Sequence, residues 1–297
     1  FGRTDLEVTA FGFGTAPLGN IFREVDEETS QAMFTHAWEA GVRFFDSAPM
    51  YGHGLSELRT GHALRWEKRD DFVLASKVGR LLRPAKRETI DFAPWVNAAP
   101  FTLHFDYSYD GTMRAFEDSL QRLGLERMDM CFIHDIDVFT RGGEQPEVFE
   151  QAMEGAWRAL EKLRSEKLVK AIGVGGNEWE VCHEALKRHD FDCFLLAGRY
   201  TLLDRSAYSR VVIRVAPVDA PSVAGQLTAL RDLYEQRFVE LVAALPLRDQ
   251  TQARDLRLLL LGGLNWSQTW FREGGEQTPA QIAAGFVRLL RSTQRGN

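Results

Sequence analysis

The stretch GVRFFDSAPMYG, residues 41–52, decides both the fold and the chemistry expected of this chain. Its apolar run VRFF ends at Asp46, and Tyr51 follows five residues later in a loop. Two more apolar runs end in polar groups, FVLASKVG at Lys77 and MDMCFIHD at His134. Because a parallel barrel gathers the C-terminal ends of its strands on one face, the four polar groups are expected to converge there.

These four residue types together make a proton-relay site possible. An ammonium lowers the pKa of a phenol, a carboxylate holds the ammonium, and an imidazole orients a carbonyl. Taken singly, each residue has an ordinary alternative, because a lone lysine is usually solvated and a lone aspartate often caps a turn. His53 and His104 compete weakly with His134, and we interpret both as peripheral.

Six apolar runs alternate with helical patterns over about 190 residues. The strands are expected at residues 8–14, 42–45, 72–78, 128–135, 169–175 and 191–198, and the helices at residues 25–40, 55–67, 110–124, 148–166 and 178–189. The alternation predicts an α/β fold of the (β/α)8 TIM-barrel type that is truncated after the sixth strand. An open doubly wound sheet is the alternative, but GFGTAPLGN at residues 12–20 lacks the GxGxxG spacing of such folds.

A long connection between the third strand and the next helix carries three prolines and six aromatic residues, over residues 79–109. Loops of this length are uncommon unless they are functional, so this loop is expected to cover a ligand. The alternative is that its aromatic side chains pack on the outside of the barrel. Asp110 is expected to cap the following helix, and Gly124 to end it.

Three segments carry a resemblance to a known family. They are GVRFFDSAPMYGHGLSELRTGHAL at residues 41–64, LASKVG at 74–79 and FDYSYDGTMRAFEDSLQRLGLERMDMCFIHD at 105–135. These segments resemble the aldo-keto reductase superfamily, in the branch that contains pyridoxal 4-dehydrogenase, L-fucose dehydrogenase and D-threo-aldose dehydrogenase. The resemblance covers residues 1–206, which are expected to form a partial aldo-keto reductase barrel.

The resemblance implies a role for each of the four polar residues. Tyr51 is the expected general acid and base, Lys77 lowers the pKa of Tyr51, Asp46 pairs with Lys77, and His134 orients the carbonyl or alcohol. The reaction implied is hydride transfer between a nicotinamide and a sugar-like or pyridoxal-like alcohol or aldehyde. The expected catalytic set is therefore Asp46, Tyr51, Lys77 and His134.

The resemblance also implies NAD or NADP as the cofactor. Gly14, Thr15, Asp46 and Asn177 match positions that approach the nicotinamide in relatives. The glutamine that the family carries on its sixth strand falls at Ala197 here, which leaves that contact without its usual side chain. No metal is expected in the site.

The C-terminal part of the chain departs from the barrel pattern. Residues 207–297 are expected to be helical, and the run LLLLGGLNWSQTWFREGGEQTPAQIAAGFVRLL at 258–290 resembles the dimerisation helices of tetracycline-repressor-type regulators. The expected seventh and eighth strands, whose loops hold the cofactor phosphates in the family, are not recognisable. A natural fusion and a recombined reading frame both fit this pattern. The alternative function is therefore a catalytically impaired chimeric protein that dimerises through its helical tail.

Composition limits the partners that the chain is expected to have. The net charge of −6 argues against nucleic-acid or membrane-surface binding, and no basic helix-turn-helix segment precedes the helical part. No apolar run approaches the roughly 20 residues of a membrane span, and no secretory leader is seen. Three cysteines without a CxxC pair fit a reducing cytoplasm. The expected partners are a small-molecule substrate and a second copy of the chain, bound through the C-terminal helices.

Overall fold

The computed structural model describes residues 4–9, 11–198, 236, 240 and 281. The chain divides into two compact units, and residues 4–9 and 11–198 belong to the first. Gln236, Glu240 and Gln281 belong to the second unit and have helical backbone conformation. The predicted truncation after the sixth strand and the rest of the predicted helical segment lie outside the described residues.

A single parallel sheet forms the centre of the first unit. Its strand order is β1-β2-β3-β6-β7-β8, and every neighbouring pair is parallel. The strands are β1 (Phe13–Gly14), β2 (Phe44–Asp46), β3 (Val73–Val78), β6 (Met130–His134), β7 (Ala171–Gly176) and β8 (Cys193–Leu196). All six predicted strands are therefore present, in sequence order, as a half-barrel. Strand β1 is shorter than the predicted run of residues 8–14.

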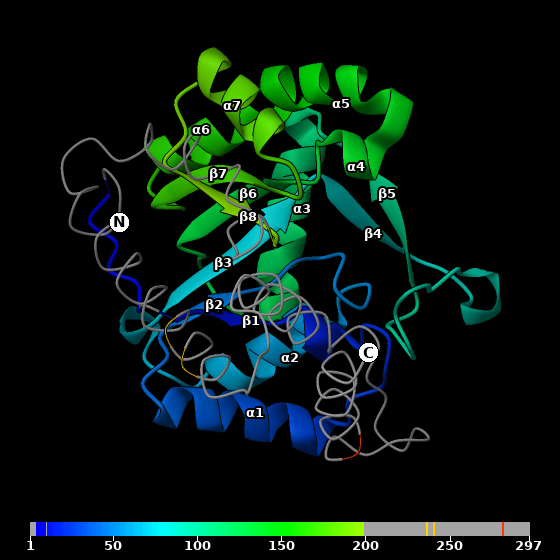
Figure 1. The fold of residues 1–297 in the computed structure, drawn as a ribbon, viewed down its shortest axis with the longest axis vertical. Helices are drawn as coiled ribbons and strands as arrows, with labels where there is room; N and C mark the ends of the chain where they lie inside the picture. The colour runs from blue at the N-terminus through cyan, green and yellow to red at the C-terminus, as the bar shows by residue number, and fades with distance from the viewer. Residues whose placement is uncertain (1–3, 10, 199–235, 237–239, 241–280, 282–297) are drawn as a thin grey trace, which may run out of the picture. The chain divides into compact units, whose positions relative to one another are not determined.

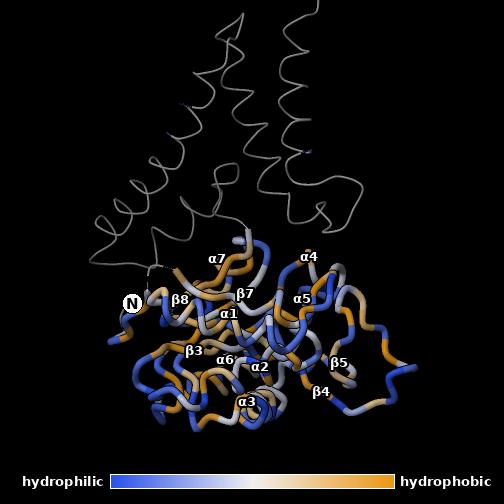
Figure 2. The backbone as a smooth tube through the Cα atoms, turned by 90° about the horizontal axis from the view of Figure 1, so that it is seen from below, coloured by the Kyte–Doolittle hydropathy of each residue, from blue (hydrophilic) through white to orange (hydrophobic). Residues whose placement is uncertain are grey.

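The larger helices form an arc around this sheet. They are α1 (Glu27–Glu39), α2 (Leu55–Leu64), α3 (Tyr109–Leu123), α6 (Trp157–Ser165) and α7 (Trp179–Arg188). Helix α1 packs on α2, α2 on α3, and α3 on α6. Figure 1 shows α1 and α2 on one side and α6 and α7 on the other. Hydrophobic and hydrophilic stretches alternate along these helices in Figure 2, as expected of helices with one buried face.

The start of α3 differs from the prediction. Ser108, not Asp110, is the N-cap, and its Oγ accepts a hydrogen bond from the amide of Gly111 at 3.1 Å. The extended backbone of Ser108 lets its side chain turn back over the first helical amides. Asp110 lies inside the first turn instead. The predicted end is confirmed, because Gly124 takes the left-handed conformation with φ of 64°.

The helix predicted at residues 148–166 is present, but a π-helical turn divides it. It consists of α5 (Gln145–Gln151), a π-helical turn (Ala152–Ala156) and α6. A Cβ on Gly155 would lie 2.6 Å from the carbonyl oxygen of Tyr107. The glycine therefore permits a close approach between this turn and the segment that precedes α3. Two short elements, α4 (Val138–Arg141) and a 3-10 turn, precede α5.

The connection at residues 79–109, predicted as a loop, contains an antiparallel hairpin. Strand β4 (Arg80–Pro84) pairs with β5 (Phe101–Phe105), and Figure 1 shows this hairpin extending away from the parallel sheet. Prolines such as Pro84 and Pro100 argue against a strand in the sequence. Pro84, however, lies at the last pair of the ladder, where a missing amide hydrogen is tolerated. Trp95, between the two strands, is 5% exposed and forms a β-bridge with Ile21.

Candidate active site

Three neighbouring strands deliver the polar groups that the sequence singles out. Asp46 is the last residue of β2, Lys77 lies one residue before the end of β3, and His134 is the last residue of β6. Strand β3 pairs with both β2 and β6, so the three C-terminal ends lie side by side. Tyr51 comes from the loop between β2 and α2. The structure therefore brings all four residues together at one end of the sheet.

Lys77 and Asp46 form a buried ion pair. The Nζ atom of Lys77 lies 2.9 Å from Oδ1 and 2.7 Å from Oδ2 of Asp46, and it also donates to the carbonyl oxygen of Ser47 at 2.7 Å. Burial alone would lower the pKa of Lys77, but the Asp46 carboxylate and Tyr51 outweigh it and raise that pKa. Burial raises the pKa of Asp46, and Lys77 opposes that change. Lys77 is therefore a fixed cation at the centre of the site.

Tyr51 lies against this cation. The Nζ atom of Lys77 is 4.8 Å from the centroid of the Tyr51 ring. Burial raises the pKa of Tyr51, and Lys77 opposes the rise without reversing it. Lys77 thus acts in the expected direction, but loss of hydration outweighs its charge, and the net pKa of Tyr51 is raised. A raised pKa favours the protonated phenol, which is the form that donates a proton.

His134 is held close to Tyr51. The two ring centroids are 6.0 Å apart, and the rings are nearly perpendicular at 84°. The imidazole is buried, and burial, followed by the charges of Arg80 and Lys77, lowers the pKa of His134 well below its usual 6.5. His134 is therefore a neutral imidazole at physiological pH, able to donate one hydrogen bond and accept another.

The aromatic residues and the other histidines have separate places. The Trp95 ring centroid lies 5.8 Å from that of Tyr51, so part of the long connection does reach the site. The Nδ1 atom of His53 lies 2.6 Å from the carbonyl oxygen of Phe101, which ties the Tyr51 loop to β5. His104 lies within β5, with Nε2 3.0 Å from the hydroxyl of Thr102.

The residues predicted to contact the cofactor lie at the ends of different strands and have different surroundings. Gly14 is exposed at the end of β1, and a Cβ added there would meet nothing within 4 Å. Thr15 is fully buried, with its hydroxyl 2.6 Å from Ser56 Oγ and 2.9 Å from the Asp46 carbonyl oxygen. Its hydroxyl therefore supports the backbone of Asp46. Asn177 follows β7, and its amide nitrogen donates to Asp137 Oδ2 at 2.5 Å. The backbone amide of Ala197 donates to the carbonyl oxygen of Gly176 at 2.9 Å.

Sequence reasoning missed several polar groups beside His134. Asp135 and Asp137 are both buried; Asp135 forms an ion pair with Arg80 at 2.7 Å, and Asp137 accepts from the amide of Thr140. Tyr107 donates its hydroxyl hydrogen to the carbonyl oxygen of His134 at 2.7 Å. The run HDID, residues 134–137, with acidic residues directly after a buried strand, was the available signal.

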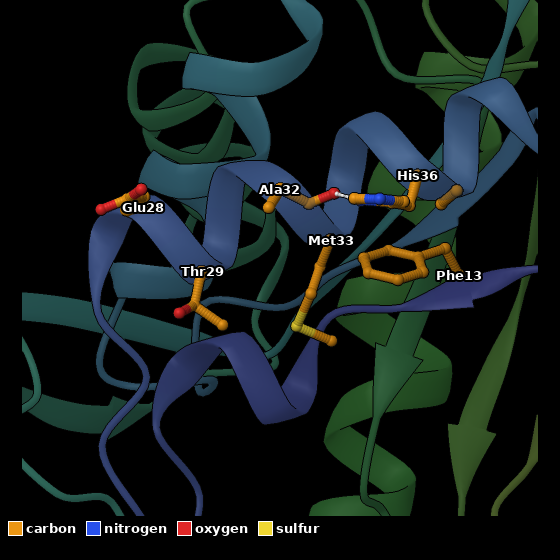
Figure 3. A pocket seen from close by; sticks show the side chains of 7 residues that line it. Phe13, Glu28, Thr29, Ala32, Met33 and His36 are labelled. Atoms are coloured by element: carbon orange, nitrogen blue, oxygen red, sulfur yellow. Dashed lines mark hydrogen bonds between the residues drawn. The ribbon is translucent and has the colours of Figure 1, made fainter.

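A separate pocket lies along α1. Figure 3 shows that Phe13 of β1 and a face of α1 line it, through Glu28, Thr29, Ala32, Met33, His36 and Ala37. It shares no residue with the cluster of Asp46, Tyr51, Lys77 and His134. Its one imidazole, that of His36, has Nδ1 2.6 Å from the carbonyl oxygen of Ala32 in the preceding helical turn. The pocket therefore adds nothing to the chemistry at the strand ends.

Three further features of the described residues concern disulfides, metal-binding groups and membrane-spanning helices. Cys131, Cys182 and Cys193 are free and buried. Within residues 4–9 and 11–198, no three His, Cys, Asp or Glu side chains are placed to hold a metal ion. None of the described helices has the length and apolar character needed to cross a membrane.

Comparison with known proteins shows which enzymes this chain resembles. The chain is 44% identical over 215 residues to pyridoxal 4-dehydrogenase of Microbacterium luteolum, a match covering 69% of this chain and 62% of that protein. It is 36% identical over 228 residues to D-threo-aldose 1-dehydrogenase of a Pseudomonas species, covering 75% and 66% respectively. The chain thus spans less than two thirds of the length of both relatives.

Solved structures and family models extend the comparison. An aldo-keto reductase structure from Pseudomonas aeruginosa aligns with a TM-score of 0.54 and 26% identity, covering 72% of each chain. Residues 200–293 match the family model for the tetracyclin repressor-like C-terminal domain. Residues 10–217 match the model for the Aldo/keto reductase family, which is more than half of the chain. The chain therefore belongs to the aldo/keto reductase family.

Proposed function

We propose that this chain is an NAD(P)-dependent oxidoreductase that transfers a hydride between nicotinamide and a sugar-like or pyridoxal-like alcohol or aldehyde. The observation that carries the proposal is the buried cluster of Asp46, Tyr51, Lys77 and His134 at three adjacent strand ends. The names of the two curated relatives support the substrate class. The family's use of a nicotinamide cofactor supports the reaction type.

Each of the four residues has a defined task in this proposal. The bound nicotinamide supplies the hydride donor or acceptor. Tyr51 gives a proton to the substrate oxygen during reduction and takes one during oxidation. Lys77 stabilises the phenolate that reduction leaves behind, and Asp46 keeps Lys77 in place at 2.7 Å. His134, as a neutral imidazole, directs the substrate oxygen toward Tyr51.

The residues at the strand ends fit a nicotinamide. The end of β1 is open at Gly14, where even a methyl group would contact nothing. At the end of β7, Asp137 Oδ2 accepts from the backbone amide of Asn177 at 2.5 Å and from its side-chain Nδ2 at 3.3 Å. We assign the Asn177 side chain the contact with the carboxamide. Thr15 acts indirectly in this proposal, by fixing the Asp46 backbone.

An absorbance assay at 340 nm tests the proposal directly. The protein is mixed with NAD or NADP and either a pyridoxal-like alcohol or a small aldose, and formation of the reduced nicotinamide is followed. Tyr51→Phe should lower turnover about 100-fold or more, the scale of losing a general acid and base. Tyr109→Phe is the matched control, because Tyr109 lies at the start of α3 and should keep wild-type turnover. Equal turnover in Tyr51→Phe and wild type would end the assignment.

We also propose that the protein works as a cytoplasmic homodimer without nucleic-acid or membrane partners. The match of residues 200–293 to a repressor-type C-terminal domain supports the second copy. A catalytically impaired chimera is the less favoured alternative, because the four polar groups of the active-site cluster are all in place at the strand ends.

A further inference from the structure

We propose that Asp135, held by Arg80, is a positioning residue that keeps the ring proton of His134 on Nε2 and steadies the side-chain amide of Asn177. The inference rests on the proposed function for the roles of His134 and Asn177, but its main test does not need turnover. It concerns a buried carboxylate that the four-residue cluster does not use.

The backbone of Asp135 is fixed in an uncommon conformation. Its φ is 53°, in the left-handed region that non-glycine residues other than Asn and Asp rarely adopt. Two neighbours hold it there: the Tyr107 hydroxyl donates to the carbonyl oxygens of His134 at 2.7 Å and Asp135 at 3.2 Å, and the Asp135 amide donates to Gly175 at 2.8 Å. The carboxylate of this fixed residue lies beside the imidazole of the preceding residue, His134.

The Asp135 carboxylate then contacts both functional side chains. Its Oδ2 lies 3.4 Å from His134 Nε2, and its Oδ1 accepts from Asn177 Nδ2 at 3.4 Å. Asp135 shares that amide with Asp137 Oδ2 at 3.3 Å and Thr140 Oγ1 at 3.4 Å. An acceptor beside one ring nitrogen favours the neutral tautomer that carries its proton there. Nε2 therefore keeps a hydrogen to share with a substrate carbonyl oxygen, whereas the other tautomer would present a lone pair to that carbonyl oxygen and repel it.

Arg80 stabilises the buried, charged carboxylate of Asp135. Its Nη2 donates to Asp135 Oδ2 at 2.7 Å, and the side chain is 2% exposed. Within the described part of the chain, its Nε and Nη1 have no hydrogen-bond partner, and its Cζ lies 4.9 Å from the Phe105 ring centroid. Asp135 is thus the hydrogen-bond partner of this guanidinium. The pairing matters because a buried carboxylate without a neighbouring cation would take up a proton and cease to be a strong acceptor.

The other charged groups near His134 keep its ring neutral but do not decide which ring nitrogen carries the proton. Lys77 approaches from β3, Tyr51 from the loop after β2, and Arg80 from β4. Both cations disfavour an imidazolium, so the ring has one proton to place. Asp135 is the acidic group in contact with its Nε2 atom.

Nuclear magnetic resonance of the full chain labelled with 15N-histidine tests the proposal. Long-range correlations distinguish a protonated from an unprotonated ring nitrogen, and the His134 signal is assigned by its loss in His134→Asn. Wild type should show one neutral tautomer with the proton on Nε2. Asp135→Asn, which tolerates the left-handed backbone, should give a mixture of both tautomers. Arg80→Met should give the same mixture, and Arg80→Lys should restore the wild-type signal.

Asp129→Asn is the matched control, because Asp129 is also buried and paired with an arginine, with Arg69 Nη2 2.6 Å from its Oδ2. It lies directly before Met130, at the opposite end of β6 from His134. This variant should lose stability but leave the His134 signal unchanged. In the turnover assay, Asp135→Asn should lower kcat/KM by about 10- to 100-fold, as is usual for partners that orient a functional group. A wild-type proton on Nδ1, or an unchanged tautomer in both Asp135→Asn and Arg80→Met, would overturn the proposal. Absence of turnover in the wild type would instead count against the proposed function alone.

Discussion

At the scale of single residues, burial and the charge of Lys77 act in opposite directions on the pKa of Tyr51. Burial raises the pKa of Tyr51, and the Lys77 ammonium 4.8 Å from its ring limits that rise. A raised pKa favours the protonated phenol, which is the form that reduction requires. Oxidation needs the phenolate, so its rate should increase with pH until the pKa of Tyr51 is passed.

Replacing Lys77 should therefore shift the pH profile in one direction. Without the ammonium the pKa of Tyr51 rises further, so the rising limb of oxidation should move to higher pH. At neutral pH the oxidation rate should fall about 10-fold for each unit of that displacement, which is a loss of about 1.4 kcal/mol per unit. The variant to measure is Asp46→Asn with Lys77→Met, because Lys77→Met alone leaves a buried unpaired carboxylate. A limb at the wild-type pH would contradict this role for Lys77.

Sequence reasoning finds some site residues and misses others for a physical reason. Asp46, Lys77 and His134 stand where apolar runs end, and parallel strands bring such ends together whatever the details of packing. Arg80 and Asp135 are 55 residues apart, and their contact depends on the hairpin and on a left-handed backbone at Asp135. Neither feature has a periodic signature in the sequence. The net pKa of Tyr51 likewise depends on burial, which the motif does not reveal.

At the scale of elements, the N-terminus of α3 offers a direct comparison of two neighbouring polar residues. Ser108 caps the helix through the Gly111 amide, whereas Asp110 lies within the first turn. Ser108→Ala should lower the free energy of unfolding by about 1 kcal/mol, the usual effect of losing a cap. Asp110→Ala should lower it by only a few tenths of a kcal/mol, through the helix dipole. Urea unfolding of both variants measures the difference, and a larger loss for Asp110→Ala would contradict this cap.

Some helices and strands have a strongly periodic spacing of apolar residues in the sequence, and others do not. The six strands and the long helices were predictable because buried runs and one-sided apolar helices recur with fixed spacing. The hairpin of β4 and β5 was not, since Pro84 and Pro100 dominate the local signal while cross-strand pairing decides the outcome. The π-helical turn at Ala152–Ala156 depends on the tertiary approach of Gly155 to Tyr107, which no local pattern encodes.

At the scale of the whole molecule, two family matches meet within one chain. Residues 10–217 match the reductase model and residues 200–293 the repressor-type model, so the boundary predicted at residue 206 falls where the two overlap. The resemblances seen in the sequence named both families, and the exact division at residue 206 stays a prediction. The arrangement of the predicted C-terminal helices falls outside the described residues and remains a prediction.

Assembly is the property that the C-terminal match predicts most clearly. Repressor-type C-terminal helices and the dense apolar residues at 258–290 favour pairing of two identical copies, the commonest symmetric contact. Sedimentation equilibrium at micromolar concentration should give a mass of about twice 33.7 kDa. The full chain is measured over a range of dilutions, because a dimer should dissociate toward the monomer mass as the concentration falls. A mass of 33.7 kDa at all concentrations would rule out the dimer.

All the proposed roles depend on nicotinamide binding at the strand ends, in a chain that spans 62% of its pyridoxal 4-dehydrogenase relative. Titration with NADH and with NADPH, followed by nicotinamide fluorescence, tests this claim most directly. We predict a dissociation constant below about 10 μM for at least one of them, or about −7 kcal/mol. Tyr51→Phe should bind equally well, because it removes a proton donor rather than a cofactor contact. Binding weaker than about 1 mM for both cofactors would contradict the account.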